Sequence, residues 1–211
     1  MHGPLRLISW ACAIACLSGC NDTIDYDCSV FPPAESSQYV LPWHIGHAYV
    51  ASPHAARETS PQKYAIDVPM PIGTDVLAIR AGTVVRVEEQ FFDGDNVPGH
   101  ENYVFVQHDD GSVARYVHLT NSGAAVAVND SVQPGQLIGY SGHTGNSTDP
   151  HLHLDVSRGC CVVPPNWNEL PIGETIPLSF RNAKPVNVGN RRALKTECGL
   201  QRGVSYEAVA L

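Results

Sequence analysis

The chain has 211 residues, of which 43% are hydrophobic and only 16% charged, and it carries 18 glycines and 16 prolines. This turn-rich composition excludes a helical bundle, and the length suits one domain with a hydrophobic core and a small additional segment. The formal net charge of −8 argues against a nucleic acid partner, because a protein that binds phosphates needs a basic face.

Residues 1–20 have the pattern of an export signal. Arg6 precedes an apolar run over residues 7–17, which is too short to span a bilayer. The run ends in Leu17-Ser18-Gly19-Cys20, which resembles the lipobox of bacterial lipoproteins and implies that an acylated Cys20 becomes the mature N-terminus. The alternative is an ordinary secretory signal cut nearby. Both interpretations predict export, and the first anchors the protein by lipid to the periplasmic face of an envelope membrane.

Four cysteines follow Cys20, namely Cys28, Cys160, Cys161 and Cys198. An even number of cysteines in an exported protein predicts two disulfides. Adjacent cysteines strain the peptide between them when they pair, so we predict that Cys160 and Cys161 each pair with Cys28 or Cys198, the partner being left open. A zinc site built from these four cysteines is the alternative, although their spacing lacks the paired Cys-x-x-Cys form.

Residues 21–40 are polar and acidic, and we expect a tether with little regular structure. From residue 41 onward, short apolar segments alternate with turns rich in glycine, proline, asparagine and aspartate. The expected strands cover residues 41–50, 64–68, 75–79, 83–88, 102–108, 112–119, 126–128, 131–132, 136–140, 151–156 and 175–180. Strands at this spacing predict an all-β fold, a compact antiparallel sheet or sandwich with long loops. We expect one domain over residues 41–183 and a small C-terminal extension over residues 184–211.

The most informative stretch is a turn rich in glycine and serine that leads into a His-x-His segment. Pro150 suits the first residue of a strand, since proline cannot donate to the ladder. Alternate residues of a strand share a face, so His151, His153 and Asp155 point one way while the intervening apolar residues point into a core. The two imidazoles can reach one metal ion, and Asp155 can orient one of them. Solvent-facing histidines and an exposed charge are the alternative.

Three further residues are candidates for the same site. Asp67 lies in the apolar run of residues 65–68, where a carboxylate costs free energy unless it is paired or bound to a metal. His118 ends a predicted hairpin strand, and His54 lies in the loop before the Asp67 strand. In catalytic zinc sites, two histidines and a carboxylate can bind the metal and leave one coordination position open. Further histidines nearby can transfer protons. We expect His100, His108 and His143 to be surface residues.

Several motifs occur in a characteristic order over roughly residues 41–180. Together they resemble the M23 peptidase family, the zinc endopeptidases of the lysostaphin and LytM type. The resemblance rests on Asp67 with Pro71-x-Gly73-Thr74-x-Val76-x-Ala78, on Tyr116-x-His118-Leu119, on Val132-x-x-Gly135-Gln136-x-Ile138-Gly139, and on Ser141-Gly142-x-Thr144-Gly145 followed by Pro150-His151-Leu152-His153. It implies the LytM-type β fold, a bound Zn²⁺ and a peptidase activity.

The resemblance also implies roles for particular residues. It implies that Asp67 and His153 bind the zinc ion, and that His118 and His151 are the catalytic pair. Many members place the remaining ligand, a histidine, four residues before the aspartate, where this chain has Lys63.

Other members carry the first histidine further upstream, after a Leu-Pro and glycine lead-in. Leu41-Pro42 and Gly46 fit that version, which makes His54 the ligand. His44 and His47 are weaker candidates, and if none of these histidines binds, the site is degenerate.

The implied substrate is a peptide amide in the stem-peptide cross-links or cross-bridges of peptidoglycan. Two alternatives stay open. A degenerate domain would regulate other wall hydrolases without catalysis, which Lys63 favours, and a zinc hydrolase could act on another peptide. Nothing in the sequence predicts an obligate oligomer, so we expect a monomer.

Overall fold

The computed structural model describes residues 27–54, 60–158, 174–186 and 198–211. Within these ranges helix is limited to two 3-10 turns, η1 (Cys28–Val30) and η2 (Ala34–Ser36), and none of it is long and apolar enough to cross a membrane. The strands are β1 (Ala48–Pro53), β2 (Ile66–Pro69), β3 (Asp75–Leu77), β4 (Gly82–Glu88), β5 (Tyr103–Gln107), β6 (Val113–Val117), β7 (Leu119–Ala124), β8 (Ser131–Val132), β9 (Leu137–Ser141), β10 (His151–Arg158), β11 (Glu174–Thr175), β12 (Ala183–Val186) and β13 (Val204–Ala208).

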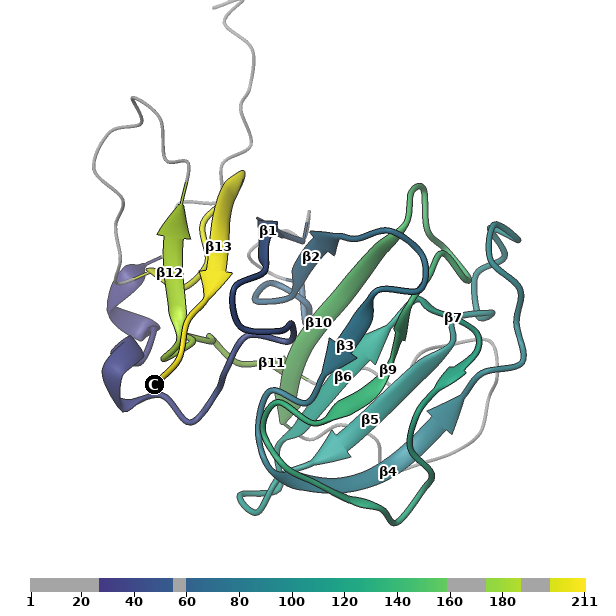
Figure 1. Cartoon of the computed structure of the whole chain (residues 1–211), viewed down its shortest axis with the longest axis horizontal. Coiled ribbons are helices and arrows are strands. Elements are labelled where there is room, and N and C mark those ends of the chain that lie inside the picture. The colour runs from purple at the N-terminus through teal and green to yellow at the C-terminus, as the bar shows by residue number, and fades with distance from the viewer. Residues whose placement is uncertain (1–26, 55–59, 159–173, 187–197) are drawn as a thin grey trace, which may run out of the picture.

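The strands form a ten-stranded sheet and a three-stranded sheet (Figure 1). The large sheet has the order β12-β13-β1-β2-β10-β6-β5-β4-β8, with β11 also paired to β10, and the small sheet has the order β3-β9-β7. Every pairing between these strands is antiparallel. The all-β antiparallel fold predicted from the sequence is therefore confirmed.

The core lies between the two sheets. Val76 and Ile138 of the small sheet belong to the same buried cluster as Val104 and Leu152 of the large sheet. Strand β10 shows how the sequence specifies this packing, because its apolar residues at alternate positions are at most 1% exposed and face the cluster. The predicted two-faced pattern of β10 is confirmed, and it leaves His153 and Asp155 on the opposite face.

The strand expected over residues 41–50 is observed only from Ala48 onward, as the start of β1. Two other expected strands also differ from the observed ones. Residues 126–128 were expected to form a strand on their alternating apolar pattern, but the strand is β7, which begins directly after His118 and pairs with β9. Residues 127–130 form a turn instead, in which the backbone N–H of Ala127 donates to the Asp130 side chain at 2.8 Å. Of residues 175–180, only Thr175 lies in a strand, and Phe180 forms an isolated bridge to Tyr39. In both places tertiary pairing overrides local propensity.

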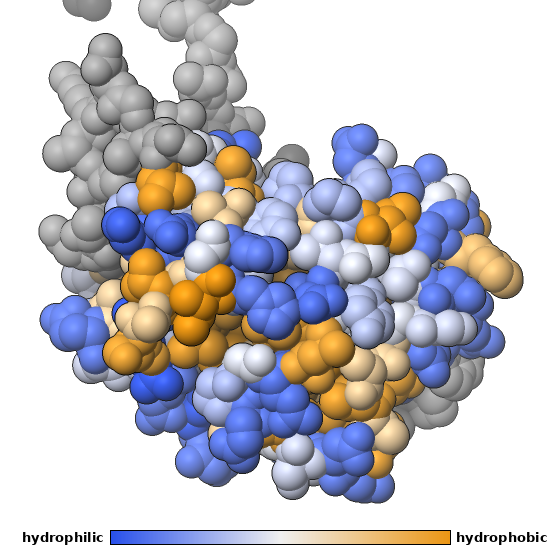
Figure 2. Space-filling model, viewed as in Figure 1, coloured by the Kyte–Doolittle hydropathy of each residue, from blue (hydrophilic) through white to orange (hydrophobic). Residues whose placement is uncertain are grey.

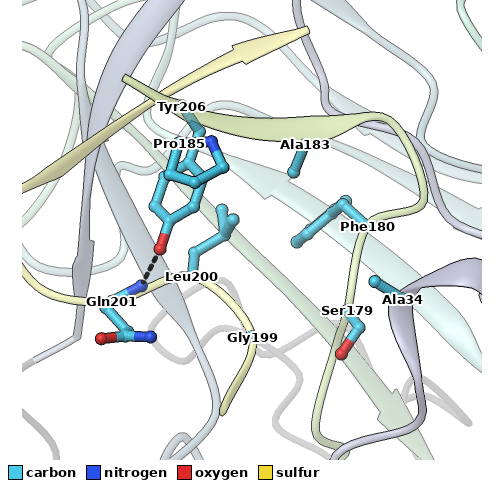
Figure 3. A pocket seen from close by; sticks show the side chains of 9 residues that line it. All are labelled: Ala34, Ser179, Phe180, Ala183, Pro185, Gly199, Leu200, Gln201 and Tyr206. Atoms are coloured by element: carbon cyan, nitrogen blue, oxygen red, sulfur yellow. Dashed lines mark hydrogen bonds between the residues drawn. The ribbon is translucent and has the colours of Figure 1, made fainter. Parts of the chain in front are cut away.

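The C-terminal residues extend the large sheet. Strand β13 pairs with β1 over four residues and with β12 on its other side. An apolar cavity of about 100 Å³ lies where this hairpin meets the N-terminal segment. Figure 3 shows three of its lining residues, Phe180, Leu200 and Tyr206, and among the described residues no charged side chain lines it. A hollow of about 520 Å³ lies beside the C-terminus and is lined by Trp43, Leu77 and Leu211 among others. Figure 2 shows apolar patches separated by polar residues on the face viewed there.

A disulfide joins the two ends of the described chain. Cys28 and Cys198 are 170 positions apart in sequence, and their Cα atoms are 4.5 Å apart. The prediction that Cys160 and Cys161 pair with these two cysteines is therefore wrong. The cysteine spacing does not reveal that the segment before β13 returns to the N-terminal residues, where Cys198 meets Cys28. Cys160 and Cys161 lie outside the described residues.

Removing this bridge by the double change Cys28→Ser and Cys198→Ser is expected to lower the free energy of unfolding by about 3–5 kcal/mol. The bridge closes a loop of most of the chain, so its loss restores much conformational entropy to the unfolded state. Chemical denaturation of the variant and the wild type, both followed by fluorescence, measures the difference. An unchanged midpoint and slope would contradict the expectation.

Candidate metal centre and active site

Three neighbouring strands of the large sheet bring the candidate ligands together. Strand β2 pairs with β10 so that Asp67 lies directly opposite His153. On its other side β2 pairs with β1, where Ser52 is opposite Asp67, and His54 follows immediately after this strand. Figure 1 shows β1, β2 and β10 in this order. The register of two strand pairs thus places side chains from residues 54, 67 and 153 at one point.

The Asp67 carboxylate lies between two imidazoles. Its Oδ2 is 2.8 Å from Nδ1 of His54, and its Oδ1 is 2.9 Å from Nδ1 of His153. One donor atom from each of the three residues lies within 4.8 Å of the others. Two imidazole nitrogens and a carboxylate oxygen at these separations form a donor set that suits zinc.

The other upstream candidates lie elsewhere. His44 pairs with Asp75 at 2.8 Å in an exposed position, and its ring contacts that of His47. Lys63 places its ammonium group 4.8 Å from the centre of the Tyr64 ring. Among the described histidines that precede Asp67, only His54 belongs to the three-residue cluster.

A buried charge pair fixes the far side of the His153 ring. Asp155 and Arg115 are both fully buried and lie opposite each other on β10 and β6. Arg115 donates from Nε to Asp155 Oδ1 at 2.8 Å and from Nη2 to Oδ2 at 2.5 Å. The same Oδ2 lies 3.2 Å from Nε2 of His153. Nε2 therefore carries the hydrogen that Asp155 accepts, which directs Nδ1 of His153 towards Asp67.

Electrostatics in this centre favour a cation. Burial opposes the charged form of Asp67, but hydrogen bonds from His153 and His54 outweigh it and hold the pKa of the Asp67 carboxyl far below its ordinary value. Burial likewise acts to lower the pKa of His153, but the bonds to Asp155 and Asp67 raise it to about 9. Without a metal, a proton on His153 therefore balances the two carboxylates, and a metal ion can replace that proton.

A second pair of histidines lies beside the first cluster. The ring centres of His118 and His151 are 4.6 Å apart, and Nε2 of His151 is 3.8 Å from Asp67 Oδ1. Nδ1 of His118 donates to the carbonyl of Thr144 at 2.7 Å, and Nδ1 of His151 donates to the carbonyl of Asp149 at 2.8 Å. The Nδ1 hydrogen of His118 therefore leaves its Nε2 free to accept a proton. Burial, reinforced by the charge of His151 and His153, lowers the pKa of His118 to about 3, so His118 is neutral at pH 7.

The remaining histidines lie away from this group. His100 pairs with Asp95, and His143 is half-buried with Nδ1 at 2.9 Å from Ser147 Oγ. The expectation that His108 is a surface residue is wrong, since it is only 4% exposed and donates to the carbonyl of Ala81. Its position at the end of β5, beside a polar turn, suggested exposure.

Comparison with known proteins identifies the family. The model of Peptidase family M23 matches residues 61–165, about half of the chain, in a segment that holds Asp67, His118, His151 and His153. The chain belongs to peptidase family M23. The matched segment of this M23 chain begins after His54, so the family match itself does not include that histidine.

Named relatives match slightly more than half of the M23 chain. Peptidoglycan DD-endopeptidase ShyA of Vibrio cholerae is 38% identical over 112 residues, which are 53% of this chain and 24% of that protein. Lysostaphin of Staphylococcus simulans is 35% identical over 119 residues, which are 56% of this chain and 22% of that protein. The chain thus spans about a quarter of the length of these curated relatives. The solved catalytic domain of that lysostaphin is 34% identical, with a TM-score of 0.39 over 55% of this chain and 80% of the domain.

Proposed function

We propose that this M23 chain is a zinc endopeptidase that hydrolyses the peptide cross-links of bacterial peptidoglycan. The observation that carries the proposal is the convergence of His54, Asp67 and His153 within 4.8 Å, beside the pair His118 and His151. The names of two relatives, a peptidoglycan DD-endopeptidase and a glycyl-glycine endopeptidase, support a substrate of this class.

The zinc ion would be held by Nδ1 of His54, a carboxylate oxygen of Asp67 and Nδ1 of His153. When bound, zinc acts as a Lewis acid towards a carbonyl oxygen and lowers the pKa of a coordinated water molecule. The buried pair of Asp155 and Arg115 orients His153 for this role, in the way that carboxylates orient metal-binding histidines in general.

The second pair of histidines would move protons and stabilise charge. His118 is buried and neutral, so its Nε2 accepts a proton from the attacking water. The side chain of His151 is more accessible, at 17% exposed, and its Nε2 lies 3.8 Å from Asp67 Oδ1. A His151 that enters the step protonated would stabilise the developing oxyanion and give its proton to the leaving amine, and His118 would then release the proton taken from water to solvent, while His151 takes one up. The deeper burial of His118 supports this proposed division of roles.

Export and a lipid anchor on Cys20 are part of the proposal. Residues 1–26, which carry the lipobox-like segment, lie outside the described residues. A peptidoglycan substrate requires that the domain reach the cell wall, and the disulfide between Cys28 and Cys198 is consistent with an oxidising compartment. We further propose that residues 41–183 form the peptidase domain and that residues 184–211 are its C-terminal extension.

Digestion of purified cross-linked muropeptides, followed by mass spectrometry, tests the proposed function. The protein supplied with zinc is expected to cleave the cross-links, and both EDTA and the His151→Ala change are expected to stop the cleavage. Muropeptides left intact by the zinc-loaded wild type would overturn the proposal. A chain that also bound no zinc would instead be assigned to the regulators without catalysis.

The change Asp155→Asn is expected to weaken zinc binding by about 10–100-fold. Asparagine removes the charge that matches Arg115 and disturbs the acceptor for Nε2 of His153, so the ring loses its fixed orientation. Competition with a chelator measures the affinity. Ser157→Ala is the matched control, because Ser157 donates to the other oxygen of Asp155 at 2.9 Å and does not touch the ring. Equal affinities of Asp155→Asn and the wild type would contradict this role.

Zinc uptake at pH 7 is expected to release close to one proton. In the metal-free protein the pKa of His153 is raised to about 9, so its ring is protonated at pH 7 and must lose a proton to bind metal. The apparent affinity should therefore rise by about tenfold per pH unit between pH 7 and pH 9 and then level off. Calorimetry in two buffers of different ionisation enthalpy counts the protons. No release, with an affinity independent of pH, would contradict the expected protonation.

A further inference from the structure

A loop rich in carboxylates packs against the glycine-rich turn that precedes the His-x-His strand. We call residues 91–101 the carboxylate loop and residues 141–147 the glycine turn. Three side chains of the loop accept three backbone N–H groups of the turn. Asp93 accepts from His143 at 2.6 Å, Asp95 from Gly145 at 3.0 Å, and Glu101 from Asn146 at 3.1 Å.

The carboxylate loop is itself held in place. The second oxygen of Asp93 accepts from the hydroxyl of Thr120 at 2.5 Å. The second oxygen of Asp95 is 2.8 Å from Nδ1 of His100, whose ring stacks on Phe91 with 4.3 Å between centres. The carboxylates of Asp93 and Asp95 are therefore each oriented by a second partner in addition to the N–H group of the turn.

Two glycines allow this close approach. A Cβ added to Gly142 would lie 2.3 Å from the backbone nitrogen of Thr120 and 2.6 Å from Asp93 Oδ1. Gly145 has a φ of +69°, and a Cβ there would lie 2.5 Å from Cγ of Glu101. The turn and the loop are thus in direct contact, and the turn has little freedom to move towards the loop.

The opposite side of the glycine turn holds the candidate catalytic pair. The carbonyl of Thr144 accepts from Nδ1 of His118, and the hydroxyl of Ser147 lies 3.3 Å from Nδ1 of His151. His118 has a φ of +63°, a left-handed conformation that a non-glycine residue keeps only when its surroundings impose it. The position of the Thr144 carbonyl therefore decides where the His118 ring lies and which nitrogen carries its hydrogen.

We propose that Asp93, Asp95 and Glu101 are positioning residues for His118 and His151. By holding the N–H groups on both sides of Thr144, those of His143, Gly145 and Asn146, they keep the Thr144 carbonyl aimed at His118. That contact places the hydrogen of His118 on Nδ1 and leaves Nε2 as the proton acceptor. The catalytic part of this inference rests on the proposed function, whereas the placement of the His118 hydrogen does not.

The test compares Asp93→Ala with Asp93→Asn. Alanine removes the acceptor for the His143 N–H, whereas asparagine keeps an oxygen there. Asp93→Ala is expected to lower kcat on muropeptides by about 10–100-fold, with an unchanged zinc affinity, because a small displacement of a catalytic group has effects of this size. Asp93→Asn is expected to restore most of the rate. A wild-type kcat for Asp93→Ala, or an asparagine variant as slow as the alanine variant, would overturn the proposal.

Nitrogen NMR of labelled histidines provides a readout independent of activity. His118 should show hydrogen on Nδ1 in the wild type and a mixture of the two forms in Asp93→Ala. Asp110→Ala is the matched control, since Asp110 accepts the N–H of Ser112 in a turn that holds no catalytic residue. It should leave the His118 signals unchanged. If the wild type cleaves no muropeptide, the proposed function fails, and an unaltered His118 signal in Asp93→Ala would by itself overturn the positioning role.

Discussion

His54→Ala is expected to weaken zinc binding by more than roughly 100-fold and to abolish peptidase activity at low zinc. Losses of up to about 100-fold are typical when a residue that hydrogen-bonds to a metal ligand is removed, and loss of a ligand itself should cost more. Nδ1 of His54 lies 2.8 Å from Asp67 Oδ2, on the side opposite His153, so its removal leaves two of three donors. The position matters because Lys63 occupies the place where many family members carry this histidine. Titration of the metal-free protein with zinc against a chelator measures the loss.

A nearly identical pair elsewhere supplies the control for this change. His44 lies 2.8 Å from Asp75, the same separation as in the pair of His54 and Asp67, but it is exposed and outside the cluster. His44→Ala is expected to bind zinc as the wild type does. Wild-type affinity in His54→Ala, together with a large loss in Lys63→Ala, would show that the ligand set is assigned incorrectly.

His118→Ala is expected to lower kcat by about 10²–10⁴-fold while zinc still binds with nearly unchanged affinity. The side chain is buried beside His151 and His153, but its Nδ1 donates to the Thr144 carbonyl, so it is not a proposed zinc ligand. Its proposed role is proton transfer at Nε2. His151→Ala should lower kcat by a factor in the same range. The double variant of His118→Ala and His151→Ala should lower kcat by less than the product of the two single factors. Steady-state kinetics with stoichiometric zinc separates these effects from loss of metal.

His44→Ala and His47→Ala serve as surface controls for the catalytic pair. Both histidines are exposed and contact each other outside the cluster, so each change removes an imidazole without touching the pair or the residues that position it. Their kcat values should stay within about tenfold of the wild type. A loss of zinc in His118→Ala, equal to that in Asp67→Ala, would instead assign His118 to the metal.

Local pattern was enough to predict the parts of the site that depend on residue type and strand period. The alternation in residues 151–156 predicts which side chains share a face, and a carboxylate inside the apolar Asp67 strand signals a paired or liganded group. The same signal was present for Arg115, a charged residue in the apolar run of β6, and it could have identified the partner of Asp155.

Other features depend on contacts that residue type does not encode. The pairing of Cys28 with Cys198 requires that β13 return to the N-terminal segment, which only the assembled sheet reveals. Asp93 binds the glycine turn through a backbone N–H group. Every residue except proline offers such a group, so the residue types do not reveal the contact. Residues 120–124 carry the polar Thr120 and Ser122, so they were not predicted as a strand, and only the pairing with β9 reveals β7 there.

The most direct test of the central claim is anomalous diffraction at the zinc absorption edge from crystals grown with zinc. The account predicts a single peak per chain, bounded by Nδ1 of His54, the Asp67 carboxylate and Nδ1 of His153. No peak at this position, or a peak in contact with cysteine sulfur or with His44 and Asp75, would contradict it.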